Sequence, residues 1–197
     1  MHLREFIECC NDLVRCSEDS PQAWRWVVEG DHSYICMKKR ELTCVLQTKQ
    51  CDAVQDEHFA ELNLEADPAC ASKSGILSRM VLYEYHVVYN ESYAVPMLLF
   101  NIYDEGGSRL DLEEAWDVLK IGDSVDTSAK YHAVTMVHHP IVFRPYLSLH
   151  PCKTPELLDS LSHSANAVLS FLTTYGPYVN LRQDDLAASL LRTIGVQ

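Results

Sequence analysis

Residues 150–152 read His-Pro-Cys and place one of the chain's eight cysteines where a nucleophile would sit. A helix pattern starts directly afterwards: Thr154 can cap it, Pro155 suits its first position and Glu156 suits the positive end of its dipole. Unpaired amides and the dipole at a helix start favour a thiolate in the turn before it. The pattern therefore predicts Cys152 as a catalytic thiol.

The other cysteines do not form a recognisable metal or redox motif. No pair has the Cys-x-x-Cys spacing of a zinc ribbon or of thioredoxin. The first 15 residues contain acids and no long apolar stretch, so they do not read as a signal peptide. We expect free thiols and a cytoplasmic location.

Two histidines near the motif are open to more than one interpretation. His150 lies two residues from Cys152, and an extended chain would not aim it reliably at the thiol, so a structural role is favoured over direct catalysis. His139 is either a base or, by preference, a loop histidine that is exposed or caps a turn. His132 and His138 do not complete a four-ligand spacing with it, so we expect no metal and no cofactor.

A thiol that attacks a carbonyl group also needs a group that stabilises the oxyanion. Asn101 is the nearest candidate, although a residue of this kind more often has a structural role at a strand end, and it is left out of the predicted site. Tyr83 and Tyr85 are predicted to pack in the core, with a phenol reaching an acyl group on Cys152 as the lesser alternative.

Composition excludes several classes of function. The chain is 47% hydrophobic with a formal charge of −12, which is typical of a globular protein. Its only basic run is 38–40, so we expect no nucleic-acid binding. No apolar run approaches the roughly 20 residues of a transmembrane helix.

The order of the predicted elements indicates an α+β fold, with an N-terminal helix, an antiparallel meander sheet and C-terminal helices. We expect a single domain over 1–197, with an acidic, mobile insertion at about 48–78. Periodicity and turn residues predict helices at 3–16, 111–119, 155–175 and 184–193, and strands or extended segments at 33–37, 41–47, 80–89, 93–103 and 131–149.

Two details of these elements are expectations about packing. Trp24 and Trp26 should fasten the first helix to the sheet. Pro96 cannot donate to a ladder, so it should lie at an edge or bulge. The hairpin 80–103 could offer that edge to a partner strand or simply pack on helix 155–175.

The order of elements resembles the core of ubiquitin-like conjugating enzymes. Most ubiquitin-conjugating enzymes carry His-Pro-Asn several residues before their cysteine, whereas here the cysteine itself follows His-Pro, as in the autophagy conjugating enzymes of the Atg-ten and Atg-three families. The Atg-ten family is the closer match over about residues 20–30 and 80–175. The matching motifs are Trp24-Arg25-Trp26, Tyr83-Glu84-Tyr85-His86-Val87, Ser92-Tyr93-x-Val95-Pro96, Leu110 to Trp116, His139-Pro140-Ile141 and 150–154.

This resemblance implies a transferase that works through a thioester. Cys152 would accept the ubiquitin-like modifier Atg-twelve from the activating enzyme Atg-seven and pass it to a lysine of Atg-five. Three alternatives stay open: a non-catalytic modifier-binding module on the same fold, the sister activity that joins Atg-eight modifiers to lipid, and a cysteine hydrolase. The sister activity would call for a membrane-binding first helix, which the acidic residues of 3–16 do not favour.

Overall fold

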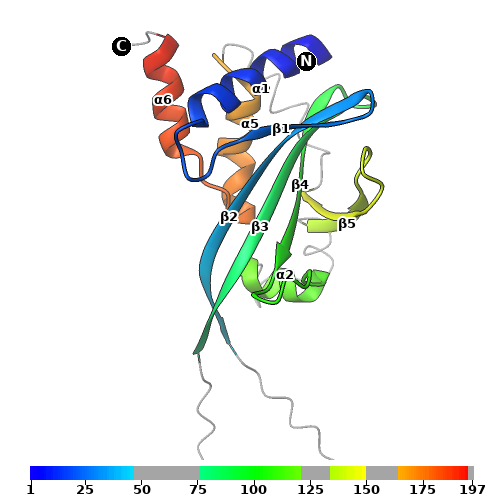
Figure 1. The fold of residues 1–197 in the computed structure, drawn as a ribbon, viewed down its shortest axis with the longest axis vertical. Coiled ribbons are helices and arrows are strands. Elements are labelled where there is room, and N and C mark those ends of the chain that lie inside the picture. The colour runs from blue at the N-terminus through cyan, green and yellow to red at the C-terminus, as the bar shows by residue number, and fades with distance from the viewer. Residues whose placement is uncertain (47–75, 121–133, 150–163, 195–197) are drawn as a thin grey trace, which may run out of the picture.

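The computed structural model describes residues 1–46, 76–120, 134–149 and 164–194 of the chain. In these ranges six strands form one antiparallel sheet in the order β1-β2-β3-β4-β6-β5 (Figure 1). This confirms the α+β fold. No helix in the described ranges is long and apolar enough to cross a bilayer.

The described elements follow one another as helix, meander, helix, hairpin and C-terminal helices. They are α1 (Leu3–Ser17), β1 (Arg25–Glu29), β2 (His32–Leu46), β3 (Ile76–Asn90), β4 (Val95–Tyr103), α2 (Leu112–Leu119), β5 (Val134–His138), β6 (Pro145–Leu149), α5 (Ala167–Tyr175), the 3-10 turn η2 (Gly176–Val179) and α6 (Asp184–Ile194).

Strand β2 is continuous, so the prediction of separate strands at 33–37 and 41–47 is wrong. Its charged middle is tolerated because its two lysines have partners and Arg40 is exposed: the Lys38 ammonium lies 3.5 Å from Glu84, and that of Lys39 lies 2.7 Å from Glu41. Cross-strand pairs of opposite charge stabilise a sheet much as apolar pairs do.

Strand β3 begins at Ile76, four residues earlier than predicted, and pairs with β2 along its length. The predicted acidic insertion at 48–78 is therefore wrong for 76–78, which are strand. The rest of that insertion lies outside the described residues.

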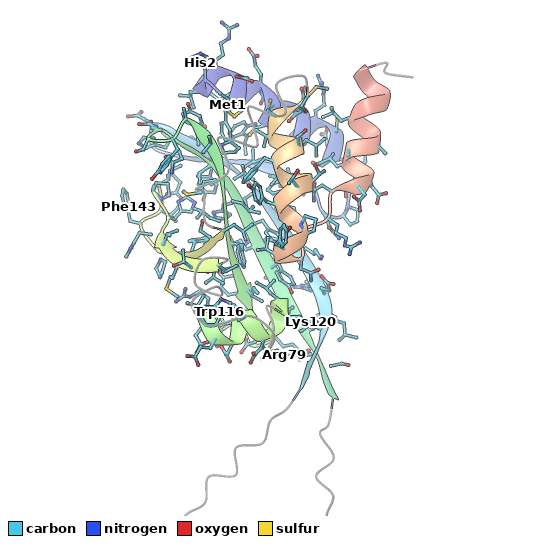
Figure 2. The ribbon with its side chains drawn as sticks, turned by 180° about the vertical axis from the view of Figure 1, so that it is seen from behind. Met1, His2, Arg79, Trp116, Lys120 and Phe143 are labelled. Carbon is cyan, nitrogen blue, oxygen red and sulfur yellow. The ribbon has the colours of Figure 1, made fainter. Side chains whose placement is uncertain are left out.

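One face of the sheet carries the main core. Helices α1, α5 and α6 lie against this face, and Figure 2 shows the side chains between them and the strands. Tyr83 and Tyr85 are fully buried there, as predicted, with stacked rings 5.7 Å apart. The Tyr85 hydroxyl donates to the Val179 carbonyl at 2.7 Å, so its one polar atom is satisfied.

The two tryptophans fasten α1 to this assembly, as predicted. The amide of buried Trp24 donates to Ser17 of α1 at 2.9 Å, and its indole donates to Gln183 at 3.0 Å. Trp26 donates to Asn11 of α1 at 2.9 Å. Trp26 belongs to strand β1, which the sequence did not predict, and Trp24 lies just before it.

Capping residues set the starts of two helices. Asp111 and Glu114 form the predicted capping box of α2, with side-chain to backbone distances of 2.8 and 3.0 Å. Helix α5 begins after Asn166, whose side chain accepts from the Leu169 amide at 2.9 Å. The predicted single helix over 155–175 is therefore wrong, because residues 164–166 are not helical and a new helix starts there. Its predicted start at Thr154 lies outside the described residues.

Strand β4 runs between β3 and β6, so the predicted hairpin is internal to the sheet. Pro96 is the second residue of this strand, opposite Tyr89, and the register of β3 and β4 has no bulge there. In the described part of the chain, β6 pairs with β4 only at Leu99 and Phe100, so the other side of Pro96 has no ladder partner and the expected edge position holds locally. One side of β4 lies against α5. This agrees with one of the two roles predicted for the hairpin, which was packing on the helix that follows it.

Candidate active site

Strand β6 leads directly to the predicted nucleophile. It is held between two neighbours: Val134 of β5 pairs with Leu149, and Leu99 of β4 pairs with Ser148. The chain leaves this strand at Leu149, immediately before the His-Pro-Cys motif. Cys152 and His150 lie outside the described residues, so their predicted roles stay predictions.

A chain of polar side chains lies on the sheet face opposite the helices. His86 of β3 lies at its centre and is almost fully buried. Its Nε2 atom is 3.2 Å from the Glu84 carboxylate, and its Nδ1 atom is 3.1 Å from Nε2 of His139. The rings of Tyr34 and Tyr146 lie 4.6 and 4.9 Å from the His86 ring and seal the cluster.

His139 organises the turn between β5 and β6. Its side chain is fully buried, and its Nδ1 atom accepts from the backbone amides of Ile141 and Val142 at 3.1 and 3.2 Å. Its backbone closes the same turn, since its amide donates to Arg144 at 2.8 Å and its carbonyl accepts from Phe143 at 3.0 Å. The predicted capping role is therefore confirmed, and the alternative of an exposed loop histidine is wrong.

Electrostatics follow from this bonding. The hydrogen bond from His86, assisted by nearby Lys38, lowers the pKa of Glu84 to about 2 against the opposing effect of burial, so its carboxylate is ionised. Burial, followed by the nearby His86, lowers the pKa of His139 to about 4, so this ring is neutral near pH 7. Glu84 therefore contributes a fixed negative charge to the cluster, and the His139 ring contributes none near pH 7.

Asn101 connects the cluster to strand β6. It lies opposite Glu84 on β4, is 3% exposed, and donates from Nδ2 to the Pro145 carbonyl at 3.4 Å. Its Oδ1 atom has no hydrogen-bond partner among the described residues. The Nδ2 group, which an oxyanion would need as its donor, thus bonds the first residue of β6. This bond supports a structural role for Asn101 over stabilisation of an oxyanion.

Of the cysteines whose side chains the structure describes, three are poor nucleophiles. Burial raises the pKa of Cys9, Cys10 and Cys36, the last to about 11, so these thiols stay protonated near pH 7. Cys36 also belongs to the one group of three possible metal ligands found in the described ranges: its sulfur, a Glu84 oxygen and a His86 nitrogen lie within 4.8 Å of one another.

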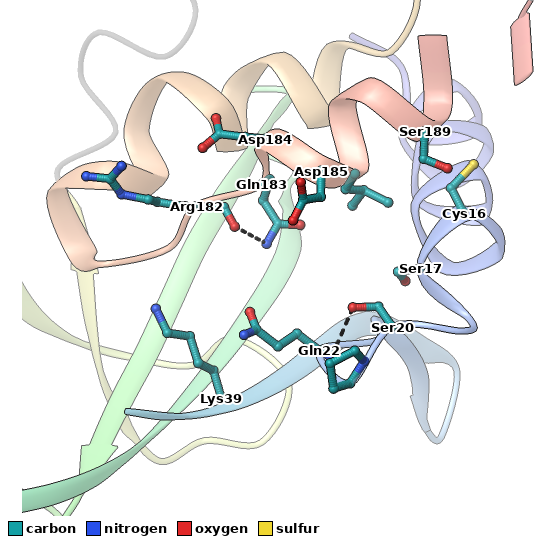
Figure 3. A pocket seen from close by; sticks show the side chains of 12 residues that line it. Cys16, Ser17, Ser20, Gln22, Lys39, Arg182, Gln183, Asp184, Asp185 and Ser189 are labelled. Carbon is teal, nitrogen blue, oxygen red and sulfur yellow. Dashed lines mark hydrogen bonds between the residues drawn. The ribbon is translucent and has the colours of Figure 1, made fainter. Parts of the chain in front are cut away.

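A polar cavity of about 500 Å³ lies at the end of α1, between β2 and the start of α6 (Figure 3). Its lining includes Cys16, Lys39 and Gln183. Lys39 already bonds Glu41 and the Asn180 carbonyl, and Gln183 bonds Trp24 and the Arg182 carbonyl. These buried polar groups are satisfied, and the cavity is assigned no chemistry.

The sequence analysis missed Glu84 and His86 as members of the site. A signal was present: strand β3 alternates, so both point to the same face, away from Tyr83 and Tyr85. Two adjacent polar positions on an otherwise apolar strand face indicate a buried partner, but that partner, His139, is 53 residues away in sequence.

The fold is the α+β arrangement expected for the ubiquitin-like conjugating class, and the match to a family model shows that class. The family model described as "Autophagocytosis associated protein, active-site domain" matches residues 5–186, and the chain belongs to this family. It is similar to the human ubiquitin-like-conjugating enzyme ATG10, with 28% identity over 90% of this chain and 88% of the relative. The Arabidopsis thaliana protein of the same name is 28% identical over 87% of this chain and 86% of its own length.

These relatives confirm the resemblance inferred from the motifs. The protein is a conjugating transferase of autophagy that handles ubiquitin-like modifiers. The non-catalytic module and the hydrolase are thereby set aside.

Proposed function

We propose that Cys152 carries the modifier Atg-twelve as a thioester, receives it from the activating enzyme Atg-seven and transfers it to a lysine of Atg-five. The observation that carries this proposal is the position of the His-Pro-Cys motif directly after strand β6, which β4 and β5 hold on both sides. The raised pKa values of Cys9, Cys10 and Cys36 support the choice of a different thiol.

The chemistry has two balanced steps. In the first, the Cys152 thiolate attacks the carbonyl of the modifier's C-terminal glycine, a new carbon–sulfur bond forms, the carbon–sulfur bond to the activating enzyme breaks, and the cysteine of that enzyme leaves as a thiolate. In the second, a neutral lysine amine attacks the same carbonyl. The carbon–sulfur bond breaks, the isopeptide bond forms, the amine loses a proton, and Cys152 returns to a thiolate. ATP is consumed upstream, by the activating enzyme.

The proposal extends to the setting of the reaction. Residues 1–197 would act as a single conjugating-enzyme-like domain in the cytoplasm, where free thiols persist. The ubiquitin-like modifier and its activating enzyme would be the partners, with transfer supporting autophagosome formation.

A non-reducing gel after incubation with activating enzyme, modifier and ATP tests the proposal. Wild-type protein should give an adduct that a thiol reductant removes. Cys152→Ser should give a reductant-resistant oxyester, and Cys152→Ala should give none. Cys36→Ser is the matched control, since it removes a part-exposed thiol and should leave the adduct unchanged. An adduct that persists in Cys152→Ala contradicts the assignment.

A further inference from the structure

The bonds of His139 fix where its single proton lies. Its Nδ1 atom accepts from two backbone amides, at 3.1 and 3.2 Å, so this nitrogen carries no hydrogen. A neutral imidazole has one N–H, which must then be on Nε2. That N–H points at Nδ1 of His86, 3.1 Å away.

The same argument passes to the next ring. Since His86 accepts at Nδ1, its own proton must be on Nε2, which faces the Glu84 carboxylate at 3.2 Å. Every bond then runs in one direction, from the turn amides to His139, from His139 to His86, and from His86 to a carboxylate. Hydrogen bonds aligned in this way polarise and strengthen one another, most of all when the last acceptor is charged.

The far end of the chain returns to strand β6. Glu84 lies opposite Asn101 of β4, and Asn101 donates to the Pro145 carbonyl at 3.4 Å. Strand β6 is therefore held at its first residue by Asn101 and at the preceding turn by His139. Its other end is Leu149, where the chain enters the His-Pro-Cys motif.

We infer that His86 and His139 are positioning residues, whose one-directional hydrogen-bond chain to Glu84 fixes the β5–β6 turn and thereby the strand that presents Cys152. The inference rests on the proposed function for the role of Cys152. The direction of the hydrogen bonds between His139, His86 and Glu84 does not depend on that function. Neither histidine is assigned contact with the thioester.

Metal binding is the competing use of the same atoms. Cys36, Glu84 and His86 could surround a cation, but the chain puts a proton on the His86 nitrogen that would bind it. Removing that proton would require His139 to release the turn amides or His86 to become an imidazolate. The Lys38 ammonium, 3.5 Å from Glu84, adds further repulsion.

The first test reads the protons directly. In full-length protein labelled with ¹⁵N-histidine, long-range ¹H–¹⁵N spectra distinguish the two neutral forms of each ring. We expect a bare Nδ1 and a protonated Nε2 for both His86 and His139 at pH 7, with signals assigned from the variants below. A proton on Nδ1 of either ring overturns the inference. So does a stoichiometric response of the His86 signals to added Zn²⁺. Both readings are independent of any enzymatic activity.

The second test uses substitutions that reproduce only one of the two hydrogen-bonding nitrogens of each imidazole ring. In His139→Asn the amide oxygen takes the place of Nδ1 and can still accept from the turn. His139→Gln keeps the reach to His86 and loses the acceptor for the turn. His86→Gln keeps the donor to Glu84 but loses the acceptor for His139. His138→Asn, at the exposed neighbouring position, is the control.

Measured rates of thioester formation and of discharge to an amine should separate these variants. Misplacing a reacting group by about 1 Å can slow a reaction about 100-fold. We expect His139→Gln to slow discharge about ten-fold or more, His139→Asn to recover most of the rate, and His138→Asn to match wild type. Equal rates in His139→Gln and wild type overturn the positioning role. If His139→Gln does not fold, the discharge rate of His86→Gln and the proton positions from the spectra test the inference instead. A wild-type protein that forms no adduct on Cys152 would refute only the proposed function.

Discussion

Neighbouring leucines of strand β4 face two different environments. Leu98 points to the helices and joins the large apolar cluster that includes Tyr85 and Phe100, while Leu99 points to the other face, against Tyr34 and Tyr146. Both are almost completely buried. In the described residues the first face is closed by four helices, α1, α2, α5 and α6; the second is closed by one short turn that His139 holds together. The same strands therefore supply bulk stability on one side and a position for β6 on the other.

The largest expected effect comes from the matched pair Leu98→Ala and Leu99→Ala. Removing a buried leucine side chain costs about 2–5 kcal/mol, depending on how far the surroundings can settle into the cavity. Packed helices can move into a cavity less easily than one short turn can, so Leu98→Ala should lie near the upper end of this range and Leu99→Ala near the lower end. Urea unfolding measures both. A larger loss of unfolding free energy for Leu99→Ala would break the comparison.

Acid should act first on the polar face. The pKa of His139 is lowered from 6.5 to about 4, so the unfolded chain binds a proton more readily than the folded one between these values. Stability is then fully present above about pH 6.5 and falls as the pH drops toward 4, by at most about 1.4 kcal/mol per pH unit. Glu84, with its pKa lowered to about 2, adds a second loss as the pH falls from 4.5 toward 2.

Unfolding free energies measured from pH 7.5 to 4 check this sign and window. His139→Asn should remove the loss between pH 6.5 and 4 relative to wild type. The Leu98→Ala protein, changed on the other face, should keep the wild-type slope. An unchanged slope in His139→Asn would show that other groups govern the acid response.

The smallest effect is expected at Phe143, in the turn on the polar face. This bulky residue has φ of 53° and is 79% exposed (Figure 2), so it has backbone strain and little packing to lose. Asparagine tolerates the left-handed region better, and Phe143→Asn should stabilise by about 0.5–1 kcal/mol. Lys120→Asn, at φ 53° at the end of α2, is the control on a helix end and should gain a similar amount. Thermal unfolding measures both, and a loss at Phe143 alone would indicate packing that its exposure does not suggest.

Local signals in the sequence were sufficient for much of the fold. The capping box at Asp111, the amphipathic period of α1 and the alternation along β3 each depend on residues a few positions apart, and each was confirmed. The prediction failed where the structure depends on a partner that the local pattern does not reveal. Lys38 and Lys39 indicated a break between two strands, but their ion pairs with Glu84 of the next strand and with Glu41 allow β2 to continue. Asn166 was absorbed into a longer helix pattern, although it caps a new helix and bonds the Cys9 carbonyl of α1 at 2.9 Å.

The candidate site divides in the same way. The motif around Cys152 is contiguous and was found from the sequence, and its role stays a prediction. The chain from Glu84 to His139 joins two segments whose pairing no local pattern encodes. The capping role of His139 was anticipated, but its burial depends on Tyr34 and Tyr146, which come from two further strands.

The pairing of Leu46 with Ile76 has a practical consequence. Strands β2 and β3 continue as a two-stranded ribbon past the last pair of β3 with β4, at Leu82 and Tyr103 (Figure 1). The backbones of Leu46 and Ile76 are therefore about 5 Å apart. A tight Asn-Gly hairpin, or a fluorescent reporter whose own termini are adjacent, would fit that gap without disturbing the sheet. The ribbon's end thus offers an attachment point for tagging the enzyme away from both chain termini.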